Sequence, residues 1–334
     1  MRILIATDAW EPQTNGVVST LKQTAVHLSR RGHAVKMLTP QQFLTIACPG
    51  YKEIRLSIGV LGGVIDQFDR FEPEAVHIAT EGPLGFAVRN YCRFHGIRFT
   101  TSYHTQFPQY LRERLPVPVD WSYAALRWFH GGGERCMVST PTMQRELAGR
   151  GFSNLARWRR GVDSDLFRPR DKSWLNLPRP IAVYVGRLAV EKNLDAFLGM
   201  AWKGSKLVVG EGPERARLEK QYPGAHFVGF QHGEDLARYV AASDVMVFPS
   251  LTDTFGLVNL EAMASGVPVA AFPVTGPIDV IEDGLTGALD SDLAAAARRA
   301  LHSSPETCRE HARRYDWASC TAEFESNLVD SGIA

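Results

Sequence analysis

The sequence has few cysteines, no long apolar run and almost no net charge. Its five cysteines are scattered through 334 residues and include no Cys-x-x-Cys pair, which argues against a disulfide framework and a structural zinc site. No apolar stretch approaches the roughly 18 residues of a membrane-spanning helix. The formal net charge of +1 provides no global field that would favour nucleic acid as a partner.

We expect no secretory signal either. The N-terminus carries one arginine, Arg2, and an apolar run of only a few residues before Thr7. Such a run is too short for the apolar region of a signal peptide. We expect a cytoplasmic protein whose contact with membranes is peripheral and on the inner membrane face.

The sequence does contain a steady alternation of short apolar runs and amphipathic segments. At 334 residues, and with roughly 100–200 residues per domain, two domains are expected. Strands that alternate with helices predict a parallel sheet of right-handed βαβ units. In the first half we expect strands at residues 2–7, 33–39, 75–79, 97–102 and 136–139, and helices at 83–95 and 121–129.

The alternation pauses at residues 162–180, where three prolines and many charges are typical of a linker. It then restarts, with strands expected at 181–185, 206–209, 226–228, 244–248 and 267–271 and a helix at 257–265. Residues 305–329 are predicted to form one helix. The sequence therefore predicts an α/β protein with two doubly wound domains, 1–165 and 166–314, whose strand ends face one crevice.

The loop after the first strand, DAWEPQTNGVVST, is the first candidate site. Asn15 and Gly16 lie just before a helix, whose N-terminus can offer N–H groups to an anion. An ordinary strand-to-helix turn explains the same residues equally well.

A second candidate is VGRLAVEKN, residues 185–193, directly after a strand. Arg187 and Lys192 are five residues apart and could grip a diphosphate, Arg187 by its planar fork and Lys192 as a point charge. A solvated charged loop is the alternative, and the position after a strand argues against it.

A third candidate is SLTDTFGLVNLEAMASGVPVA, residues 250–270. Asp253 lies in the loop and Glu261 in the following helix. The turn residues between them could direct N–H groups at a phosphate or at sugar hydroxyls, and a carboxylate there suits hydroxyl recognition. The alternatives are that Asp253 is a helix N-cap and Glu261 a surface residue. The turn residues are Thr254, Phe255, Gly256 and Leu257.

Together these motifs resemble the family-4 retaining glycosyltransferases, which have the GT-B architecture. The resemblance covers the whole chain, because NGV, SYHT, RGVDSDLF, GRLAVEKN, VGEGPER and TDTFGLVNLEAMASGVPVA occur in family order. The family's hallmark is a pair of acidic residues separated by seven, and here Asp253 replaces the first glutamate. The pattern is most similar to lipid-directed members, such as sulfoquinovosyl- and glycosyl-diacylglycerol synthases and mannosyltransferases.

The resemblance implies a role for each donor-site residue. Arg187 and Lys192 would bind the diphosphate of a UDP- or GDP-linked sugar, Glu261 its ribose and Asp253 the transferred sugar. His104, in SYHT, would hydrogen-bond that sugar. The remaining donor-site residues implied are Asn15, Gly16, Gly210, Gly212, Thr254, Phe255, Gly256 and Leu257.

The implied reaction is retaining transfer without a covalent intermediate, in which the enzyme mainly stabilises the leaving diphosphate. No cofactor and no metal are expected, because cationic side chains replace the metal. Two DxD triplets, 163–165 and 290–292, could suggest a metal site. We assign the first to the linker and the second to a turn before an alanine-rich helix.

By the same resemblance, the first domain binds the acceptor, the second binds the nucleotide sugar, and a helix in 315–334 packs back on the first domain. Residues 107–130 mix basic and aromatic side chains, as an interfacial membrane segment does, although an amphipathic helix with core aromatics would also fit. Trp158, Arg159 and Arg160 could extend this basic face. The candidate acceptor or membrane residues are Tyr110, Arg112, Arg114, Trp121, Arg127 and Trp128.

We therefore expect a membrane lipid such as diacylglycerol as the acceptor. Two alternatives stay open: the same chemistry on a soluble sugar or glycan, and a nucleotide-sugar-binding protein without transfer activity. A nicotinamide dehydrogenase is disfavoured, because no G-x-G-x-x-G follows the first strand.

Overall fold

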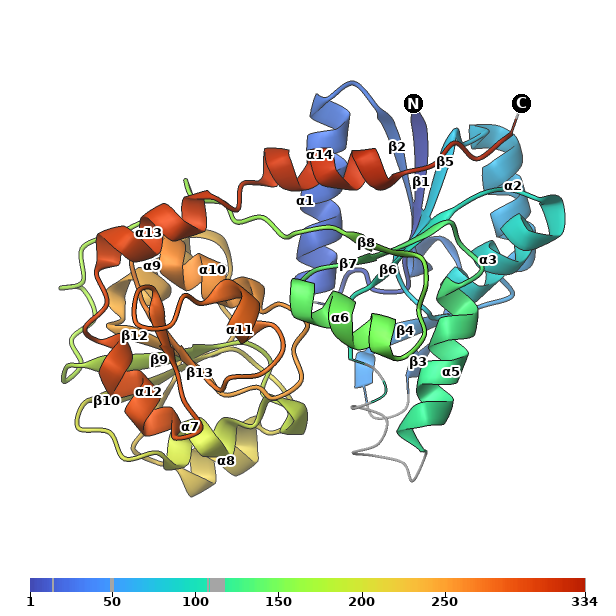
Figure 1. The fold of residues 1–334 in the computed structure, drawn as a ribbon. Coiled ribbons are helices and arrows are strands. Elements are labelled where there is room, and N and C mark those ends of the chain that lie inside the picture. The colour runs from blue at the N-terminus through green and yellow to red at the C-terminus, as the bar shows by residue number, and fades with distance from the viewer. Residues whose placement is uncertain (14, 49–50, 107, 109–117, 334) are drawn as a thin grey trace. The chain divides into compact units, whose positions relative to one another are not determined.

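The structure is a computed structural model that describes residues 1–13, 15–48, 51–106, 108 and 118–333. The chain divides into two compact units: Met1–Arg159 with Trp317–Ala334 is unit 1, and Arg160–Asp316 is unit 2. Each unit contains a six-stranded sheet with helices packed against it (Figure 1).

The sheet of unit 1 is parallel, with strand order β2-β1-β5-β6-β7-β8. Alternate residues of β1 face opposite sides: Leu4 packs towards α2 and α3, whereas Ile5 packs towards α1 and α14. Both faces are therefore buried, as in doubly wound folds. The strands are β1 (Arg2–Ala6), β2 (Ala34–Leu38), β5 (Ala75–Ile78), β6 (Thr100–Tyr103), β7 (Arg135–Val138) and β8 (Leu155–Arg157). The helices are α1 (Gly16–Arg30), η1 (Pro40–Gln42), α2 (Leu61–Phe71), α3 (Pro83–His95), α5 (Val119–His130), α6 (Pro141–Gly149) and α14 (Trp317–Asn327).

The sheet of unit 2 is also parallel, with strand order β11-β10-β9-β12-β13-β14. Val183 and Tyr184 of β9 lie in the two separate core clusters on either side of the sheet. The strands are β9 (Ile181–Val185), β10 (Ser205–Val209), β11 (His226–Phe227), β12 (Val245–Phe248), β13 (Val269–Ala271) and β14 (Gly287–Leu289). The helices are η2 (Val190–Lys192), α7 (Leu194–Gly199), α8 (Arg215–Gln221), α9 (Gly233–Ala242), α10 (Leu257–Ala264), α11 (Pro277–Val280), α12 (Leu293–Ala300) and α13 (Pro305–Arg313).

The predicted class, two doubly wound α/β units, is confirmed, but one local prediction is wrong and one element was missed. Residues 305–329 form two helices, α13 and α14, because the chain leaves the helical path between Arg313 and Trp317. An antiparallel hairpin of β3 (Leu44–Cys48) and β4 (Tyr51–Ile58) was not predicted at all. No helix of the described residues is long and apolar enough to cross a bilayer.

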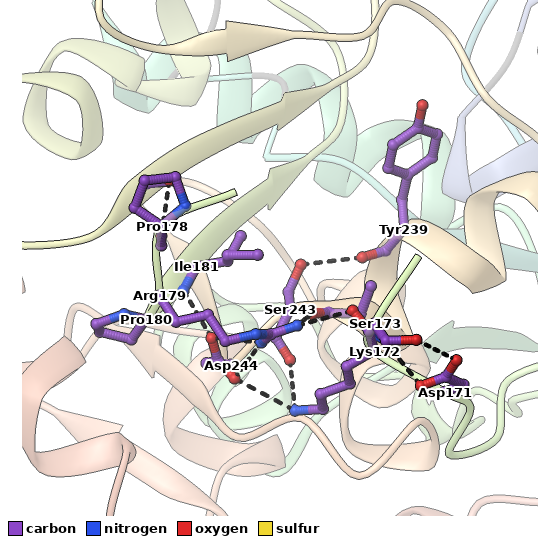
Figure 2. A network of polar contacts seen from close by, with 12 residues as sticks. Asp171, Lys172, Ser173, Pro178, Arg179, Pro180, Ile181, Tyr239, Ser243 and Asp244 are labelled. Carbon is purple, nitrogen blue, oxygen red and sulfur yellow. Dashed lines mark hydrogen bonds and ion pairs between the residues drawn. The ribbon is translucent and has the colours of Figure 1, made fainter. Parts of the chain in front are cut away.

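The predicted linker, residues 162–180, contains no helix or strand and lies within unit 2, where polar contacts fix its end to the rest of the unit. The carboxylate of Asp244 accepts two hydrogen bonds from Arg179 Nη1, at 2.7 and 2.8 Å, and one from the Ile181 backbone N–H at 2.7 Å (Figure 2). Lys172 Nζ donates to the Ser243 carbonyl at 2.8 Å. This network holds the first strand of unit 2 against the start of β12.

Candidate donor site and acceptor surface

The two loops predicted to bind the donor meet at one point of unit 2. The strand order places β9 beside β12. From β9 the chain runs outward through β10 and β11 and then returns to β12, so the strand order reverses between β9 and β12. Open α/β sheets bind ligands outside the carboxyl ends of their strands at such a point. The loops that follow β9 and β12 carry the second and third candidate motifs.

Lys192 and Asp253 contact each other directly across this point. Lys192 ends η2, and its Nζ lies 3.0 Å from Asp253 Oδ1 and 2.8 Å from Oδ2. Each side chain is about one-fifth exposed, at 21% and 20%. Asp253 is therefore an ion-pair partner, and α10 is capped by Gly256 rather than by Asp253. The structure thus joins two candidate residues that are 61 positions apart.

Arg187 follows β9 after Gly186, and neighbouring backbone fixes its loop. The Tyr184 hydroxyl donates to the Arg187 carbonyl oxygen at 2.8 Å. A Cβ on Gly210 would lie 1.9 Å from the Gly186 carbonyl oxygen, and one on Gly212 would lie 2.2 Å from that of Leu188. The structure therefore gives Gly210 and Gly212 a local reason to be glycine: the loops after β9 and β10 touch backbone to backbone.

The turn before α10 is built around Gly256. This N-cap residue has φ +81 and, as a glycine, has no side chain of its own to cap the helix. A Cβ on Gly256 would lie 2.6 Å from Asn259 Nδ2, so glycine is required by conformation and by space. Thr254 and Phe255 are both buried, and Phe255 belongs to the core of unit 2. If this turn binds the donor, the side chain of Phe255 contributes packing and only its backbone is suited to a ligand.

Glu261 lies one turn into α10 and is not a solvated surface residue. Part of the residue is accessible, but burial of its carboxyl raises the pKa to about 7. Within the described part of the chain, no hydrogen bond satisfies that carboxyl. A carboxylate with open acceptor positions beside the Lys192–Asp253 loops is suited to the two hydroxyls of a ribose.

The helix N-termini at the corresponding point of unit 1 are occupied by the chain itself. Asn15 Oδ1 accepts hydrogen bonds from the N–H groups of Val17 and Val18, both at 3.0 Å. The side chain of Asn15 thus already uses two of the N–H groups at the start of α1, and the binding of an anion there stays a prediction. Gly16, the first residue of α1, is exposed.

Asp8, which was not predicted, occupies the start of α3 in the same way. Its carboxylate accepts from the N–H groups of Leu84 at 2.8 Å and Gly85 at 3.1 Å. Burial raises the pKa of Asp8, and these two hydrogen bonds counteract part of that rise. Asp8 lies two residues after the end of the first strand, and that position could have identified it.

A second unpredicted pair lies near the same edge. Glu81 Oε1 is 3.0 Å from Nε2 of the wholly buried His130. Burial alone would lower the pKa of His130, but Cys136 and Glu81 outweigh it and raise the pKa to about 10. Asp8 and Glu81 place acidic side chains beyond the carboxyl ends of β1 and β5. This edge of the sheet therefore suits a neutral hydroxyl better than a negatively charged diphosphate.

His104 follows β6 in unit 1 and is half-buried. Its Nε2 lies 2.8 Å from Ser102 Oγ, and its ring meets that of Trp158 edge-on, with centroids 5.6 Å apart. The imidazole is therefore held by both a hydroxyl and an indole.

The outer face of α5 carries exposed aromatic side chains. Trp121 is 73% and Trp128 56% exposed, and Ala124 and Ala125 between them are also exposed. The spacing i, i+3, i+4, i+7 makes one apolar stripe. The Arg89 guanidinium lies 3.7 Å from the Trp128 ring centroid.

The structure places the other predicted acceptor residues in different surroundings. Arg127 donates to the Arg150 carbonyl oxygen at 2.9 Å, and Tyr110, Arg112 and Arg114 lie outside the described residues. Trp158 and Arg160 are buried, so the prediction that they extend a basic surface is wrong.

The two DxD triplets form local turns. Asp163 Oδ1 accepts from the N–H groups of Asp165 and Leu166, and Asp292 caps α12. Among the described residues, no three His, Cys, Asp or Glu side chains gather closely enough to hold a metal ion.

Comparison with known proteins identifies the family. Residues 14–166 match the model described as Glycosyltransferase Family 4, and residues 179–303 match the one described as Glycosyl transferases group 1. A GDP-mannose-dependent alpha-mannosyltransferase of Mycolicibacterium smegmatis is 30% identical over 323 residues, which are 86% of this chain and 84% of that protein. The chain belongs to glycosyltransferase family 4.

Two further relatives of this family-4 protein are similar over most of its length. Sulfoquinovosyl transferase SQD2 of Arabidopsis thaliana is 30% identical over 317 residues. The match covers 86% of this chain but only 62% of SQD2. Alpha-monoglucosyldiacylglycerol synthase of Streptococcus pneumoniae is 25% identical, covering 92% of this chain and 79% of that protein.

Solved structures agree with the fold of a family-4 protein. Sucrose-phosphate synthase of Thermosynechococcus elongatus superposes with a TM-score of 0.79 at 22% identity, covering 97% of each chain. HepE of Anabaena, solved with UDP-glucose, gives a TM-score of 0.73 at 17% identity, covering 98% of this chain and all 100% of that one. The predicted GT-B fold class is thereby confirmed.

Proposed function

We propose that this chain is a retaining glycosyltransferase that moves a hexose-type sugar from a nucleotide diphosphate sugar to the hydroxyl of a membrane lipid such as diacylglycerol. The observation that carries the proposal is the meeting of Lys192 and Asp253, 2.8 Å apart, where the strand order of unit 2 reverses. Arg187 lies in the same loop as Lys192, and Glu261 lies in the helix that follows Asp253.

The diphosphate belongs to unit 2 because that unit has the suitable charges. Arg187 can hold two phosphate oxygens by its fork and Lys192 can add a point charge. Gly256 at the start of α10 has no side chain of its own to cap the helix, so the first N–H groups of α10 add positive potential. In unit 1, by contrast, Asn15 and Asp8 already use the N–H groups of α1 and α3.

The chemistry that follows is mostly electrostatic. As the bond from the sugar to the diphosphate breaks, negative charge grows on the leaving oxygen, and Arg187 and Lys192 stabilise it. That oxygen takes the proton of the attacking hydroxyl on the same face of the sugar, so the anomeric configuration is retained. Asp253 and His104 would hydrogen-bond the transferred sugar, and no metal or cofactor takes part.

The donor identity is supported by what related proteins use. The mycobacterial relative is named as GDP-mannose-dependent, and HepE was solved with UDP-glucose. We therefore propose a UDP- or GDP-linked sugar.

The lipid acceptor is supported by one relative and one surface. The streptococcal relative is named as a synthase of a glucosyldiacylglycerol. The exposed stripe of Trp121 and Trp128 on α5, with the exposed Arg127 on the same helix, is typical of a helix lying at a lipid interface. Peripheral contact of α5 with an anionic membrane surface follows.

A transfer assay tests the reaction. The full chain is incubated with radiolabelled UDP-glucose or GDP-mannose, vesicles containing diacylglycerol, and excess EDTA. We expect a labelled lipid with the donor's anomeric configuration, determined by NMR. If the label is found in a soluble glycan instead of the lipid, the acceptor is a soluble sugar or glycan. Loss of activity in EDTA that Mn²⁺ restores would overturn the metal-free mechanism.

Cosedimentation with vesicles containing anionic lipid tests whether the exposed face of α5 binds a membrane. Trp121→Glu with Trp128→Glu should weaken binding at least about 10-fold, because each buried aromatic side chain contributes roughly 1.5–3 kcal/mol. Leu285→Glu, a change at a 56% exposed residue of unit 2, is the matched control and should bind as the unaltered protein does. Equal binding by all three proteins would remove α5 from the membrane surface.

A further inference from the structure

The side chain of Asn259 is buried in unit 2 without the hydrogen bonds that a buried amide normally makes. Asn259 lies in the first turn of α10 and is 0% exposed. Within the residues that the structure describes, neither its Nδ2 nor its Oδ1 has a hydrogen-bond partner. Its neighbours in α10, such as Leu260 and Met263, belong to the apolar core. A buried polar group of this kind is rare and lowers stability, so its position calls for an explanation.

The amide lies directly against the turn that carries the candidate donor residues. A Cβ on Gly256 would lie 2.6 Å from Asn259 Nδ2 and 3.0 Å from Phe248 Cζ. The backbone N–H of Asn259 also donates to the Gly256 carbonyl oxygen at 3.0 Å. A change in the backbone at Gly256 therefore changes the surroundings of the Asn259 amide.

A second glycine approaches the same turn from another element. A Cβ on Gly276, just before α11, would lie 2.9 Å from the Asp253 carbonyl oxygen and 3.2 Å from the Phe255 backbone nitrogen. Asp253 itself pairs with Lys192 at 2.8 Å. The turn is thus in close backbone contact with Gly276, whereas Asn259 brings it a polar side chain from the interior.

The geometry of the peptide group connects this amide to ligand binding. In a trans peptide the N–H and the C=O point in opposite directions. If the N–H groups of Phe255 and Gly256 point outward at a diphosphate, the carbonyl oxygens of the same two peptides, those of Thr254 and Phe255, point towards the interior. The Nδ2 group of the buried Asn259 is a donor on that interior side.

We propose that Asn259 is a positioning residue of the donor site, whose amide donates to a backbone carbonyl of residues 254–255 when a nucleotide diphosphate is bound. In the turn conformation that the structure describes, that hydrogen bond is not made. Because the amide is satisfied only in the bound conformation, this hydrogen bond adds to nucleotide affinity. The ligand in this inference rests on the proposed function, whereas the unpartnered amide does not.

Asn259→Leu tests the inference, because leucine has the same branching without the polar atoms. Without nucleotide, Tm should rise by about 2–4 °C, since an unsatisfied buried amide is removed. The Kd for UDP or GDP, whichever the unaltered protein binds, should nevertheless increase about 3–10-fold, the effect of one lost hydrogen bond. Calorimetric titration measures it. A merely structural role would not raise Tm and weaken nucleotide binding together.

Thr24→Val is the matched control. Thr24 lies in α1 of unit 1 and is 0% exposed, and its Oγ1 also has no hydrogen-bond partner in the described part of the chain. Its replacement removes an unpartnered buried atom from the other unit and should leave the Kd unchanged. If leucine is too large beside Gly256, Asn259→Val removes the amide with a smaller side chain and should give the same two results as Asn259→Leu.

The amide can also be observed directly. The full chain is labelled with [¹⁵N]asparagine, and the Nδ2 signal that disappears in Asn259→Leu belongs to Asn259. Saturating UDP or GDP should move one of its two amide protons downfield, as a new hydrogen bond does. In Thr24→Val this signal should respond as it does in the unaltered protein.

The inference would be overturned by a lower Tm in both Asn259 variants, by an unchanged Kd in both, by an equal increase of Kd in Thr24→Val, or by an Asn259 signal that does not respond to nucleotide. If the unaltered protein binds neither nucleotide, the proposed function fails and the inference fails with it. If it binds nucleotide and the Asn259 variants bind equally well, only the inference fails.

Discussion

The ammonium group of Lys192 has to serve two anions. Without donor it is paired with Asp253 at 2.8 and 3.0 Å, and with donor, in our proposal, it also faces a diphosphate. Because each side chain is only about one-fifth exposed, solvent screens this pair less than a surface ion pair. The pair keeps Lys192 extended towards the point where the phosphate would lie, so less order has to be created on binding.

Replacing Lys192 tests this arrangement. Lys192→Ala should lower kcat/KM for the donor by about 10²–10³-fold, the usual cost of removing one group that stabilises a developing anion. Nucleotide affinity should fall too, which calorimetric titration measures. Lys203→Ala, at an exposed lysine of the same unit, is the matched control. An unchanged rate in Lys192→Ala would remove this residue from the diphosphate site.

We expect Glu261 to make nucleotide binding depend on pH. Burial raises the pKa of its carboxyl to about 7 from an ordinary value of 4.5, so ionisation in the folded protein is unfavourable near neutral pH. This group therefore favours folding most below pH 4.5, and that contribution is lost as the pH rises towards 7. Ribose hydroxyls that donate to the ionised carboxylate would reverse the penalty.

Nucleotide affinity should therefore increase from pH 6 to pH 8, measured by calorimetric titration. Glu261→Gln cannot ionise and should show a flat profile across that range. If the two proteins show the same pH dependence, Glu261 does not contact the nucleotide.

At the scale of elements, the helix N-termini differ between the two units. Those of α1 and α3 are capped by Asn15 and Asp8, whereas α10 begins at Gly256, which has no side chain of its own to cap it. A capped helix start offers few N–H groups to a ligand, and an uncapped one offers several. In the proposed function, the same sheet topology serves a neutral acceptor in unit 1 and an anion in unit 2.

Two cap substitutions separate these roles. Asn15→Ala should lower the free energy of unfolding by about 1 kcal/mol and leave nucleotide affinity unchanged, as judged by urea unfolding and titration. Gly256→Ala should reduce nucleotide affinity, because φ +81 and the contact with Asn259 force the turn to move. A loss of nucleotide affinity in Asn15→Ala would show that the start of α1 does bind the donor.

The sequence predicted elements well where burial is two-sided. Apolar runs such as Ile181–Val185 are strands because both faces of the sheet are covered, and no turn interrupts them. The hairpin of β3 and β4 was missed because its apolar residues, Leu44 and Ile46, are exposed. The pattern of apolar residues alone did not reveal a pair of strands that lies outside the two main sheets.

The site was predictable only in part, for a related reason. Arg187, Lys192, Asp253 and Glu261 stand in motifs next to strand ends, which sequence shows. The position of Asn259 against the turn before α10 depends on how that helix packs in the core of unit 2. That packing is a property of the folded protein.

At the scale of the whole molecule, the chain leaves unit 1 after Arg159, forms unit 2, and returns at Trp317. The returning helix α14 lies across α1 (Figure 1), and its Phe324 is wholly buried against His77 and Trp158. The last helix of the chain is therefore part of the core beneath His104.

Phe324→Ala should lower the free energy of unfolding by about 3–5 kcal/mol, because it opens a cavity in a packed core. Urea unfolding monitored by circular dichroism measures the change. Phe94→Ala, at an 86% exposed residue of unit 1, should change it little. A small effect of Phe324→Ala would mean that α14 is not required for the stability of unit 1.

The most direct test of the account is nucleotide binding by the full chain. A thermal-shift screen against UDP, GDP, ADP and their common sugars should give a clear increase in Tm with UDP or GDP and the matching sugar nucleotide, and Lys192→Ala should abolish that increase. No shift with any of these nucleotides would contradict the assignment of Arg187, Lys192 and Glu261 to a donor site.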